Sequence, residues 1–430
     1  MSDIHSTLFS FESACQELGV KQHPYILKML KREEKECLIR QAKGEFKTSM
    51  HLYLAGNNHL LTDVRINDDD CILLQKVLLK NLFITSLDLR FNLICDKGAK
   101  ILAAMLENNT TLQRLNLMCN EIGPDGAEAL ARSLHINEML KVLLLNGNKI
   151  DNKGGMSFAQ ALQINTTLEH LDVGEADLRM ESTVALATVL RNNTSIRVID
   201  VSRPLLTTVQ EEPVVHFANM LKVNKTLEEL HLQKYDMRDF GMHRLAENLM
   251  ENFTLTYLDL SCNRITRDGV KELAKVLKLN TALCILDLGF NRLEDDGAMH
   301  IAEALASLNT NLRCLSVVSN NIGSMGLCAI ADAMKTNTTL TNVFIWGNKL
   351  EEPVCIAFDS LIKTGRLDLR NTDVKPYIVD GITYLCELSH GIRRNFYYGP
   401  TYGEDVPDWQ VRGLNPRSVK LDDDMTSLFD

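Results

Sequence analysis

The 430-residue chain lacks the segments that mark membrane-spanning and secreted proteins. No apolar run approaches the roughly 18 residues of a membrane helix. The first residues, MSDIHSTLFSFESACQ, show no basic region followed by an apolar core, so no secretion signal is expected. The 11 cysteines form neither a CxxC pair nor a Cys/His cluster with zinc spacing. We therefore expect reduced thiols in a cytoplasmic or nuclear protein, the nucleolus included, that has no membrane contact.

Motifs of common enzymes are missing as well. The sequence has no phosphate-binding G-x-x-x-x-G-K-[ST] loop, no dinucleotide-binding G-x-G-x-x-G between a strand and a helix, no H-E-x-x-H, no G-x-S-x-G and no EF-hand loop. The 11 histidines are dispersed along the chain. We expect a protein that is not an enzyme and that uses no cofactor, no metal and no small-molecule substrate.

An excess of positive charge is also missing. Lys and Arg number 46 against 56 Asp and Glu, which gives a formal net charge of −10. Proteins that bind nucleic acid without sequence preference need clustered cations to neutralise the phosphates. We expect protein partners and no direct contact with nucleic acid.

What the sequence does contain is a repeat. The stretch LQRLNLMCNEIGPDGAEALARSL at residues 112–134 returns 28 residues later as LKVLLLNGNKIDNKGGMSFAQAL. Its pattern, L-x-x-L-x-L-x-x-N, places successive asparagine positions at Asn57, Asn92, Asn120, Asn148, Ala176, Pro204, Tyr235, Asn263, Asn291, Asn320 and Asn348. Eleven turns in phase over some 300 residues indicate a repeat array.

Each repeat predicts one short strand and one helix. The leucines of L-x-L alternate, so they share one face of a strand, and segments such as DGAEALARSL carry an apolar stripe with helical spacing. Strands stack about 4.8 Å apart and helices about 8–10 Å apart, so the helices take the longer, outer arc of a horseshoe. We expect the asparagine to satisfy backbone groups where the strand ends. Tripeptides N-x-[ST], as at Asn109, Asn165 and Asn337, are interpreted as repeat chemistry and not as glycan sites.

The frame LxxLxLxxNxIxxxGxxxLAxxLxxN resembles the leucine-rich repeats of the ribonuclease-inhibitor subfamily, over residues 50–362. This resemblance implies an α/β solenoid of about 11 turns with a concave parallel sheet and convex helices. It says little about function, because the fold hosts inhibitors, GTPase activators and scaffolds. The whole chain resembles an intracellular member without catalytic domains, which implies a non-enzymatic protein of nucleus, nucleolus and cytoplasm.

The ends divide the chain further. Residues 1–49 predict two short helices that cap the array, with a break between Gly19 and Pro24, and the array itself spans 50–364. Residues 365–392 predict a C-terminal cap, with one shortened turn in GRLDLRNTDV and a closing helix in KPYIVDGITYLCELSHGI. Residues 393–430 form a tail, rich in aromatic residues and including Trp409, that is either disordered, strapped onto the array or a motif for a partner.

The middle residue of each L-x-L is expected to face the concave space. These residues are Tyr53, Asp88, Asn116, Leu144, Asp172, Asp200, His231, Asp259, Asp287, Ser316 and Phe344. Five aspartates on one ladder predict an exposed acidic stripe, although LDLS is ordinary wording for this repeat and the aspartates are otherwise mere consensus. Phe344, with Val318 and Trp346, predicts an exposed apolar patch unless the cap or tail covers it.

The asparagine is replaced in three successive turns by Ala176, Pro204 and Tyr235, and a longer step of 31 residues falls among them. Pro204 cannot donate a backbone hydrogen bond, so the turn there must differ. The irregularity is either drift in a tolerant repeat or a rim loop, Arg203 to Val215, that a partner recognises.

These patterns favour a non-enzymatic scaffold or regulator whose concave face and rim bind a protein with a basic surface. Two alternatives remain open at this point. One is a direct enzyme regulator, either ribonuclease-inhibitor-like or GTPase-activator-like. The other is a structural component of a large intracellular assembly.

Overall fold

The computed structural model describes residues 6–42, 49–58, 64–206, 211–279, 282–307 and 309–388. Described residues up to Leu205 form one compact unit, and those from Leu206 onward form a second. The predicted tail with Trp409 lies outside the described residues, and so does the 207–210 portion of the predicted rim.

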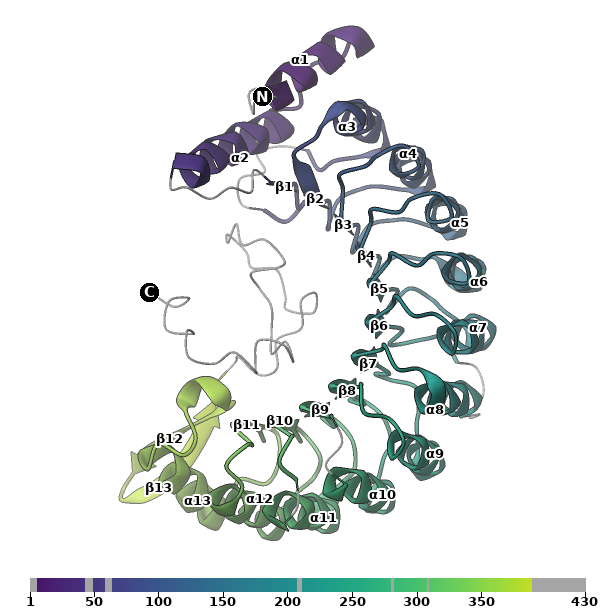
Figure 1. The fold of residues 1–430 in the computed structure, drawn as a ribbon. Coiled ribbons are helices and arrows are strands. Elements are labelled where there is room, and N and C mark those ends of the chain that lie inside the picture. Colours follow the sequence, from purple (N-terminus) through teal and green to yellow (C-terminus); the bar gives the residue numbers. More distant parts are fainter. Residues whose placement is uncertain are drawn as a thin grey trace. The chain divides into compact units, whose positions relative to one another are not determined.

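The first unit alternates helices and short strands. Its described elements are α1 (Ser6–Leu18), α2 (Pro24–Ala42), β1 (Met50–Tyr53), α3 (Asp68–Lys80), β2 (Ile84–Asp88), α4 (Asp96–Leu106), β3 (Arg114–Asn116), α5 (Pro124–Ser133), β4 (Val142–Leu144), α6 (Asp151–Leu162), β5 (His170–Asp172), α7 (Met180–Leu190) and β6 (Val198–Asp200). Strands β1 to β6 pair in parallel and in sequence order. The helices α3 to α7 cover one face of this sheet (Figure 1).

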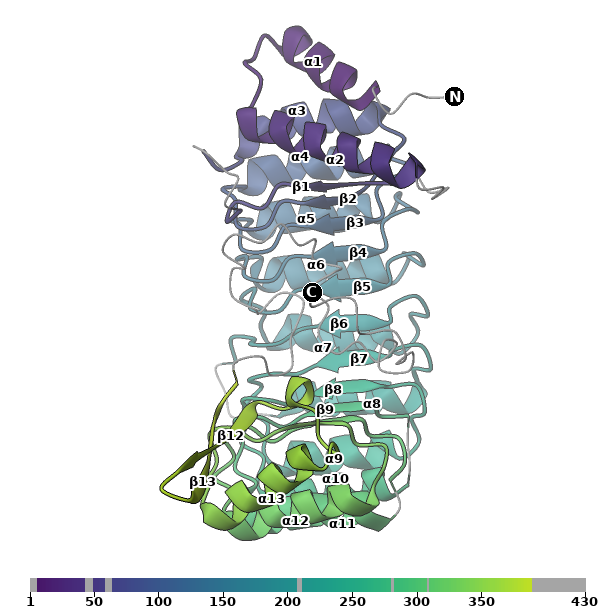
Figure 2. The ribbon, with the colours of Figure 1, turned by 90° about the vertical axis from the view of Figure 1, so that its left-hand side faces the viewer.

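The second unit repeats the arrangement and ends in a hairpin. Its described elements are α8 (Glu212–Val223), β7 (Glu229–His231), α9 (Asp239–Leu249), β8 (Tyr257–Asp259), α10 (Arg267–Lys278), β9 (Ile285–Asp287), α11 (Glu294–Ser307), β10 (Cys314–Ser316), α12 (Ser324–Thr336), β11 (Asn342–Phe344), α13 (Glu352–Lys363), η1 (Leu369–Asn371), β12 (Val374–Val379) and β13 (Ile382–Glu387). Strands β7 to β11 are again parallel, and helices again cover one face (Figure 2). The predicted α/β leucine-rich-repeat solenoid is confirmed.

The repeat leucines lie where the pattern placed them. Leu87, Leu115 and Leu143 pair across β2, β3 and β4, and all three are fully buried between sheet and helices. Leu230, Leu258 and Leu286 do the same across β7, β8 and β9. Because each turn shares its core with its neighbours, no single strand and helix could bury these side chains alone.

The asparagine after each strand does what the pattern predicts. The Asn120 side-chain amide donates to the Leu89 and Leu117 carbonyls, each at 2.9 Å, and its oxygen accepts the Ile94 N–H at 3.1 Å. One buried amide therefore satisfies backbone groups in two adjacent turns, which would otherwise be costly to bury.

A second asparagine ladder runs along the opposite, helix-to-strand edge. Asn165 donates to the Leu134 carbonyl at 2.8 Å and accepts the Leu168 N–H at 2.8 Å. Asn109 and Asn337 occupy the same position and are buried. Because their amides are used inside the fold, these N-x-[ST] tripeptides are part of the repeat.

Acidic residues join one helix to the next. The Asp96 carboxylate at the start of α4 accepts the Gly123 and Gly126 backbone N–H groups at 2.7 and 2.8 Å, at the start of α5. Asp68, Asp239 and Asp295 act in the same way on following helices. A carboxylate is favourable at a helix N-terminus, so these charges are structural.

The N-terminal helices pack on the first strand. α1 and α2 contact α3 and β1, respectively. The Tyr25 hydroxyl donates to the Ala55 carbonyl at 2.9 Å, and the Glu33 carboxylate accepts the His51 N–H at 3.1 Å. These contacts use the polar groups of a strand edge that would otherwise be open to pairing with another chain.

The C-terminal end differs in part from the prediction. The shortened turn is present: Thr372 bridges to Val343, and the Asp373 carboxylate accepts the Ile345 and Trp346 N–H groups at 2.8 and 3.0 Å. The closing helix is wrong, because that segment is the antiparallel hairpin β12–β13. Asp380-Gly381 forms its two-residue turn with positive φ at both positions, and a DG pair between alternating apolar residues favours this turn.

Candidate interaction surfaces

The sheet-face aspartates are not exposed, contrary to the prediction. Asp172, Asp200 and Asp259 are 0 % exposed, and Asp88 is also buried. The physical reason is local. In each, one carboxylate oxygen turns back to accept the backbone N–H two residues later, at 2.8 to 3.1 Å. Asn116 makes the same bond to Met118, so this position selects an acceptor and not a charge. A role for these aspartates in partner binding stays a prediction.

Asp88 also has a cation beside it. The Arg90 Nε lies 3.4 Å from the Asp88 Oδ2, and the guanidinium sits 5.3 Å from the centre of the Tyr53 ring. The negative charge at the β2 end of the ladder is therefore compensated inside the fold. An unbroken acidic stripe does not extend to this strand.

Asp287 is the sheet-face aspartate that remains partly accessible. The residue as a whole is half-buried, and its carboxylate accepts the Gly289 N–H at 2.9 Å. Burial raises the pKa of Asp287, while the Gly289 N–H, the Ser316 hydroxyl and the charge of His231 act in the opposite direction. A carboxylate charge at Asp287 therefore costs the folded state free energy.

His231 is packed into the sheet. It is buried, its Nδ1 lies 3.6 Å from the Asp259 Oδ2, and its Nε2 lies 3.8 Å from a Glu229 carboxylate oxygen. Its ring stands edge-on to Tyr257, with the ring centres 4.8 Å apart. This geometry fixes the imidazole between two carboxylates of neighbouring strands, so a direct partner contact is not favoured.

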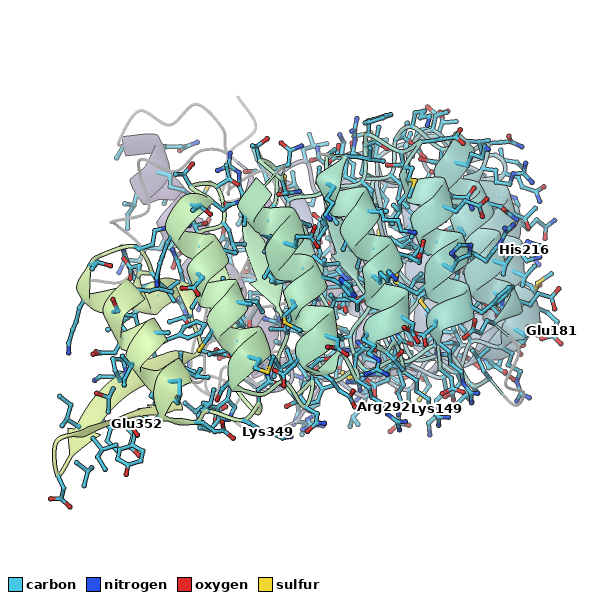
Figure 3. All side chains as sticks on the ribbon, turned by 90° about the horizontal axis from the view of Figure 1, so that it is seen from below. Lys149, Glu181, His216, Arg292, Lys349 and Glu352 are labelled. Atoms are coloured by element: carbon cyan, nitrogen blue, oxygen red, sulfur yellow. The ribbon has the colours of Figure 1, made fainter. Side chains whose placement is uncertain are left out.

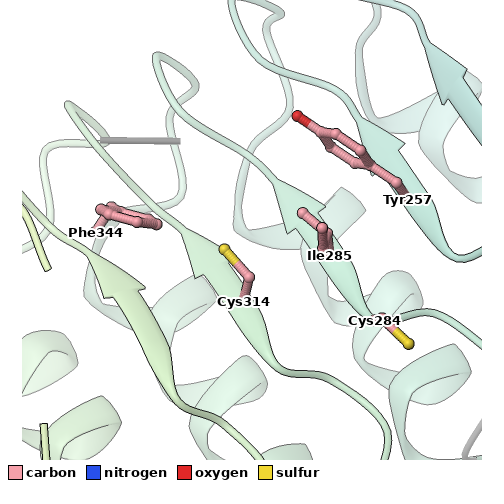
Figure 4. Packing of buried hydrophobic residues seen from close by; sticks show 5 residues of the cluster. All are labelled: Tyr257, Cys284, Ile285, Cys314 and Phe344. Carbon is pink, nitrogen blue, oxygen red and sulfur yellow. The ribbon is translucent and has the colours of Figure 1, made fainter. Parts of the chain in front are cut away.

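The predicted apolar patch exists, but as a buried cluster. Phe344 is buried together with Tyr257, Ile285 and Cys314 on four successive strands (Figure 4), and Val318 packs against them. Trp346 is half-buried. The prediction that Phe344 is exposed is wrong, because the apolar residues on neighbouring strands pack side by side. In the sequence, the signal for this cluster lies in the apolar residues two positions before Asp259, Asp287 and Ser316, which are Tyr257, Ile285 and Cys314.

The three residues that stand in place of the repeat asparagine are buried in the core. Ala176, Pro204 and Tyr235 are all buried. The Tyr235 ring is 1 % exposed and stands edge-on to Phe217 of α8, with ring centres 6.2 Å apart. Its N–H still donates to the next asparagine, Asn263, at 2.9 Å. The Tyr235 side chain fills core volume, and a contact of Pro204 or Tyr235 with a partner stays a prediction.

The exposed rim lies elsewhere in the second unit. Arg264, Arg292 and Lys349 each follow a repeat asparagine and are exposed on the edge where strands run into helices. Figure 3 shows Arg292 and Lys349 along one edge of the molecule. Phe290, which directly precedes Asn291 in the same turn as Arg292, is 57 % exposed. Of these cations, Arg264 forms an ion pair with Asp236 at 2.6 Å.

A further exposed surface, missed by the sequence reasoning, is the hairpin β12–β13. Tyr377, Ile378, Val379, Ile382 and Tyr384 are between 39 and 62 % exposed. Tyr377 and Tyr384 are paired across the strands and stack, with ring centres 5.6 Å apart. Contiguous apolar side chains at a surface are typical of an interaction site.

The described residues give little support for a metal site or a reactive cysteine. Within 6–388, apart from the gaps given above, no three His, Cys, Asp or Glu residues are grouped so that they could hold a metal ion. All 11 cysteines are free thiols, and burial raises the pKa of several, including Cys119 to about 11. A raised pKa disfavours the reactive thiolate. In the same described part of the chain, no helix has the length and apolarity to cross a membrane.

Comparison with known proteins now bears on this geometry. A model of the leucine-rich repeat matches residues 80–103, 108–131, 137–159, 251–274, 280–302 and 308–331. Human leucine-rich repeat-containing protein 34 is 58 % identical over 394 residues, which is 92 % of this chain and 84 % of that protein. The mouse protein of the same name is 53 % identical over 91 % of this chain and 93 % of its own length.

The chain belongs to the leucine-rich repeat-containing protein 34 family. This confirms the resemblance inferred from the repeat and from the whole chain. Members of the leucine-rich repeat-containing protein 34 family are named for their repeat and not for a catalytic activity, and the repeat itself is associated with protein interaction. A solved structure of leiomodin-1 actin-binding site 2 matches 36 % of this chain and 88 % of its own chain at 21 % identity. The TM-score of this match is 0.30.

Proposed function

We propose that this protein is a non-enzymatic scaffold or regulator that binds a protein partner through the strand-to-helix rim and the sheet face beside it. The observation that carries the proposal is the rim of the second unit, where Arg264, Arg292 and Lys349 are exposed directly after the repeat asparagines and Phe290 is exposed in the same turn as Arg292. Cations that flank an accessible aromatic ring are a common composition of protein-binding surfaces. The solenoid supports the proposal, since stacked repeats present one long surface for a partner.

The sheet face contributes in two ways to this proposal. Half-buried Trp346 and Asp287 adjoin the rim in the same turns and offer an apolar and an acidic contact. The buried Asp259 of this unit, and Asp172 and Asp200 of the first unit, contribute electrostatic potential and no direct contact. A basic segment of the partner would lie over these aspartates, and a different segment would meet the rim cations. The compartment we propose is cytoplasm or nucleus, the nucleolus included, supported by 11 free thiols.

The test begins with partner identification by proximity labelling in cells, with and without residues 393–430. Binding of the purified partner is then measured for Arg292→Glu/Lys349→Glu. Lys271→Glu, an exposed lysine on α10 at the helix side, is the control. We expect weaker binding with the rim pair and unchanged binding with the control. Equal affinity for all three proteins would contradict binding at the rim, and stimulated GTP hydrolysis or inhibited ribonuclease would assign the protein to the direct enzyme regulators.

A further inference from the structure

One face of the hairpin β12–β13 is exposed to solvent. Cross-strand register pairs Tyr377 with Tyr384, Val379 with Ile382, and Lys375 with Cys386. Residues two apart on a strand share a face, so these six side chains lie together. The tyrosines and the two aliphatic residues are 39 to 48 % exposed. The hairpin extends away from the repeats beside α13 (Figures 1 and 2).

The opposite face anchors the hairpin to the second unit. Val374 and Leu385 are buried, and both strands contact α13. A two-stranded hairpin on its own is marginally stable in water, and packing against α13 stabilises this one. The open face is left with exposed apolar side chains that a second layer could bury.

The middle of each hairpin edge is unfavourable for strand addition. The Leu388 N–H bonds to the Asp373 carbonyl at 2.8 Å, and this sets which residues bond within the hairpin and which point outward. On the outer edge of β12 stands Pro376, which has no N–H to offer. On the outer edge of β13 the Leu385 N–H donates to the thiol of Cys355. These features disfavour strand addition at the middle of each edge and favour a partner that packs on the face.

We propose that the occupant of this face is the same face of a second copy of this chain. Two hairpins packed face to face about a two-fold axis, with the tip of each over the base of the other, bring Tyr377–Tyr384 stacks together at the centre. The same arrangement sets Lys375, at the base, opposite Asp380 at the partner's tip, and does so twice. Both are exposed, and they lie about 17 Å apart along the strand, so they cannot pair within one hairpin.

The size of the face predicts a weak dimer. The four apolar side chains of this face, which are 39 to 48 % exposed, offer on the order of 300 Å² per copy, or about 600 Å² for the pair. Stable complexes bury roughly 1,200–2,000 Å². Dissociation in the micromolar range or weaker follows, so the protein is a monomer when dilute and a dimer when locally concentrated. This inference is independent of the rim and its partner.

Sedimentation velocity of the full chain over a concentration series tests the dimer. We expect a reversible shift from monomer to dimer, and Tyr377→Ser/Tyr384→Ser should raise the dissociation constant about tenfold or more. Phe240→Ser removes a ring that is 62 % exposed on α9 and should leave dimerisation unchanged. A protein that stays monomeric at every concentration, or a dimer that the tyrosine pair does not weaken, overturns the proposal.

The charges give a second test that does not depend on hairpin folding. Asp380 has a positive φ of 51°, which asparagine adopts readily, so Asp380→Asn keeps the turn and removes the charge. Lys375→Glu reverses the other charge. Each should weaken the dimer severalfold, most at low salt, without lowering the melting temperature of the monomer. Salt-independent dimerisation that ignores both substitutions contradicts the two-fold arrangement.

Discussion

At the scale of single residues, one side-chain type serves two roles that composition cannot separate. Aspartate caps helix N-termini at Asp96 and folds back on its own strand at Asp172. Both roles use a carboxylate oxygen as a hydrogen-bond acceptor. The formal charge of −10 therefore overstates the acidic surface, because several of its carboxylates are held inside the fold.

Asp287→Asn should make the protein more stable near neutral pH. The raised pKa of Asp287 means that the folded state holds the proton more tightly than the unfolded chain. Stability from this group is fully present below the unfolded pKa, about 4, and is lost as pH rises through the folded value. Asparagine keeps the acceptor for Gly289, as Asn116 does for Met118.

Urea melts of this variant at several pH values measure the effect. The gain should be less than about 1 kcal/mol, since the hydrogen bonds from Gly289 and Ser316 offset part of the cost of burial. It should vanish in acid, and Asp268→Asn, an exposed carboxylate, controls for the lost charge. A gain that persists below pH 4, or a loss at pH 7, would show that burial does not dominate at Asp287.

Residue roles were predictable where the backbone demands one chemistry. An amide at the end of a buried strand both donates and accepts, so the position of Asn120 announced its function. Burial of Asp172 was not predictable, because alternation tells only that its side chain leaves the core side of the sheet. It cannot tell that the carboxylate bends back to the Gly174 N–H.

At the scale of elements, neighbouring helices constrain which residues begin them. A Cβ added to Gly126 would lie 2.7 Å from the Asp96 Oδ1 and 2.8 Å from the Ala99 Cβ. The glycine of the repeat is thus required by the close approach of the preceding turn. It is not there for backbone freedom, as it sits inside α5.

Gly126→Ala should lower stability by about 1–3 kcal/mol, the usual range for an overpacked site. The substitution improves helix propensity, so a loss isolates the steric clash with Asp96 and Ala99. Thermal melts of this variant and of Ala129→Gly, on the same helix, should both fall, the second through propensity alone. A stabilised Gly126→Ala would mean that α5 can shift and that the carboxylate cap is dispensable.

Tyr235→Asn should lower stability by about 3 kcal/mol or more, although it restores the repeat consensus. The tyrosine fills volume against Phe217, and asparagine would leave a cavity around an added polar group. Tyr235→Phe is the matched control and should cost far less. Equal melting temperatures for Tyr235→Asn and the wild type would revive the view that this position is drift in a tolerant repeat.

Elements were predictable where period and turn chemistry agree, and missed where they conflict. The leucine spacing gave the repeat strands and helices correctly. The closing helix expected in the C-terminal segment is wrong, because Asp380-Gly381 between Val379 and Ile382 is a hairpin turn signal. Local turn geometry decides there, because a type I′ turn needs positive φ at both positions.

At the scale of the whole molecule, regularity made the fold predictable and left the surfaces undetermined. A repeat states the same core many times, so errors in one turn are corrected by its neighbours. Exposure depends on which side chains meet across turns. The cluster of Tyr257, Ile285 and Phe344 arises only when neighbouring strands are brought into register. The hairpin face and the rim cations are exposed surfaces, and no periodic pattern in a single sequence indicates such exposure.

Leu258→Asp tests whether neighbouring turns share one core. Leu258 is fully buried and lies in register between Leu230 of β7 and Leu286 of β9. An aspartate there would have no cation beside it, and a buried unpaired charge costs several kcal/mol. The damage should spread to the flanking turns, because Leu230 and Leu286 lose packing partners and repeats are stable only when stacked. Limited proteolysis should then cleave the loops after β7, β8 and β9 together. Asp259→Asn, one residue on, keeps its acceptor for the Ser261 N–H and should remain as resistant as the wild type. Cuts confined to the turn of β8, or none at all, would mean that each turn holds its structure alone, against the stacking argument on which the solenoid rests.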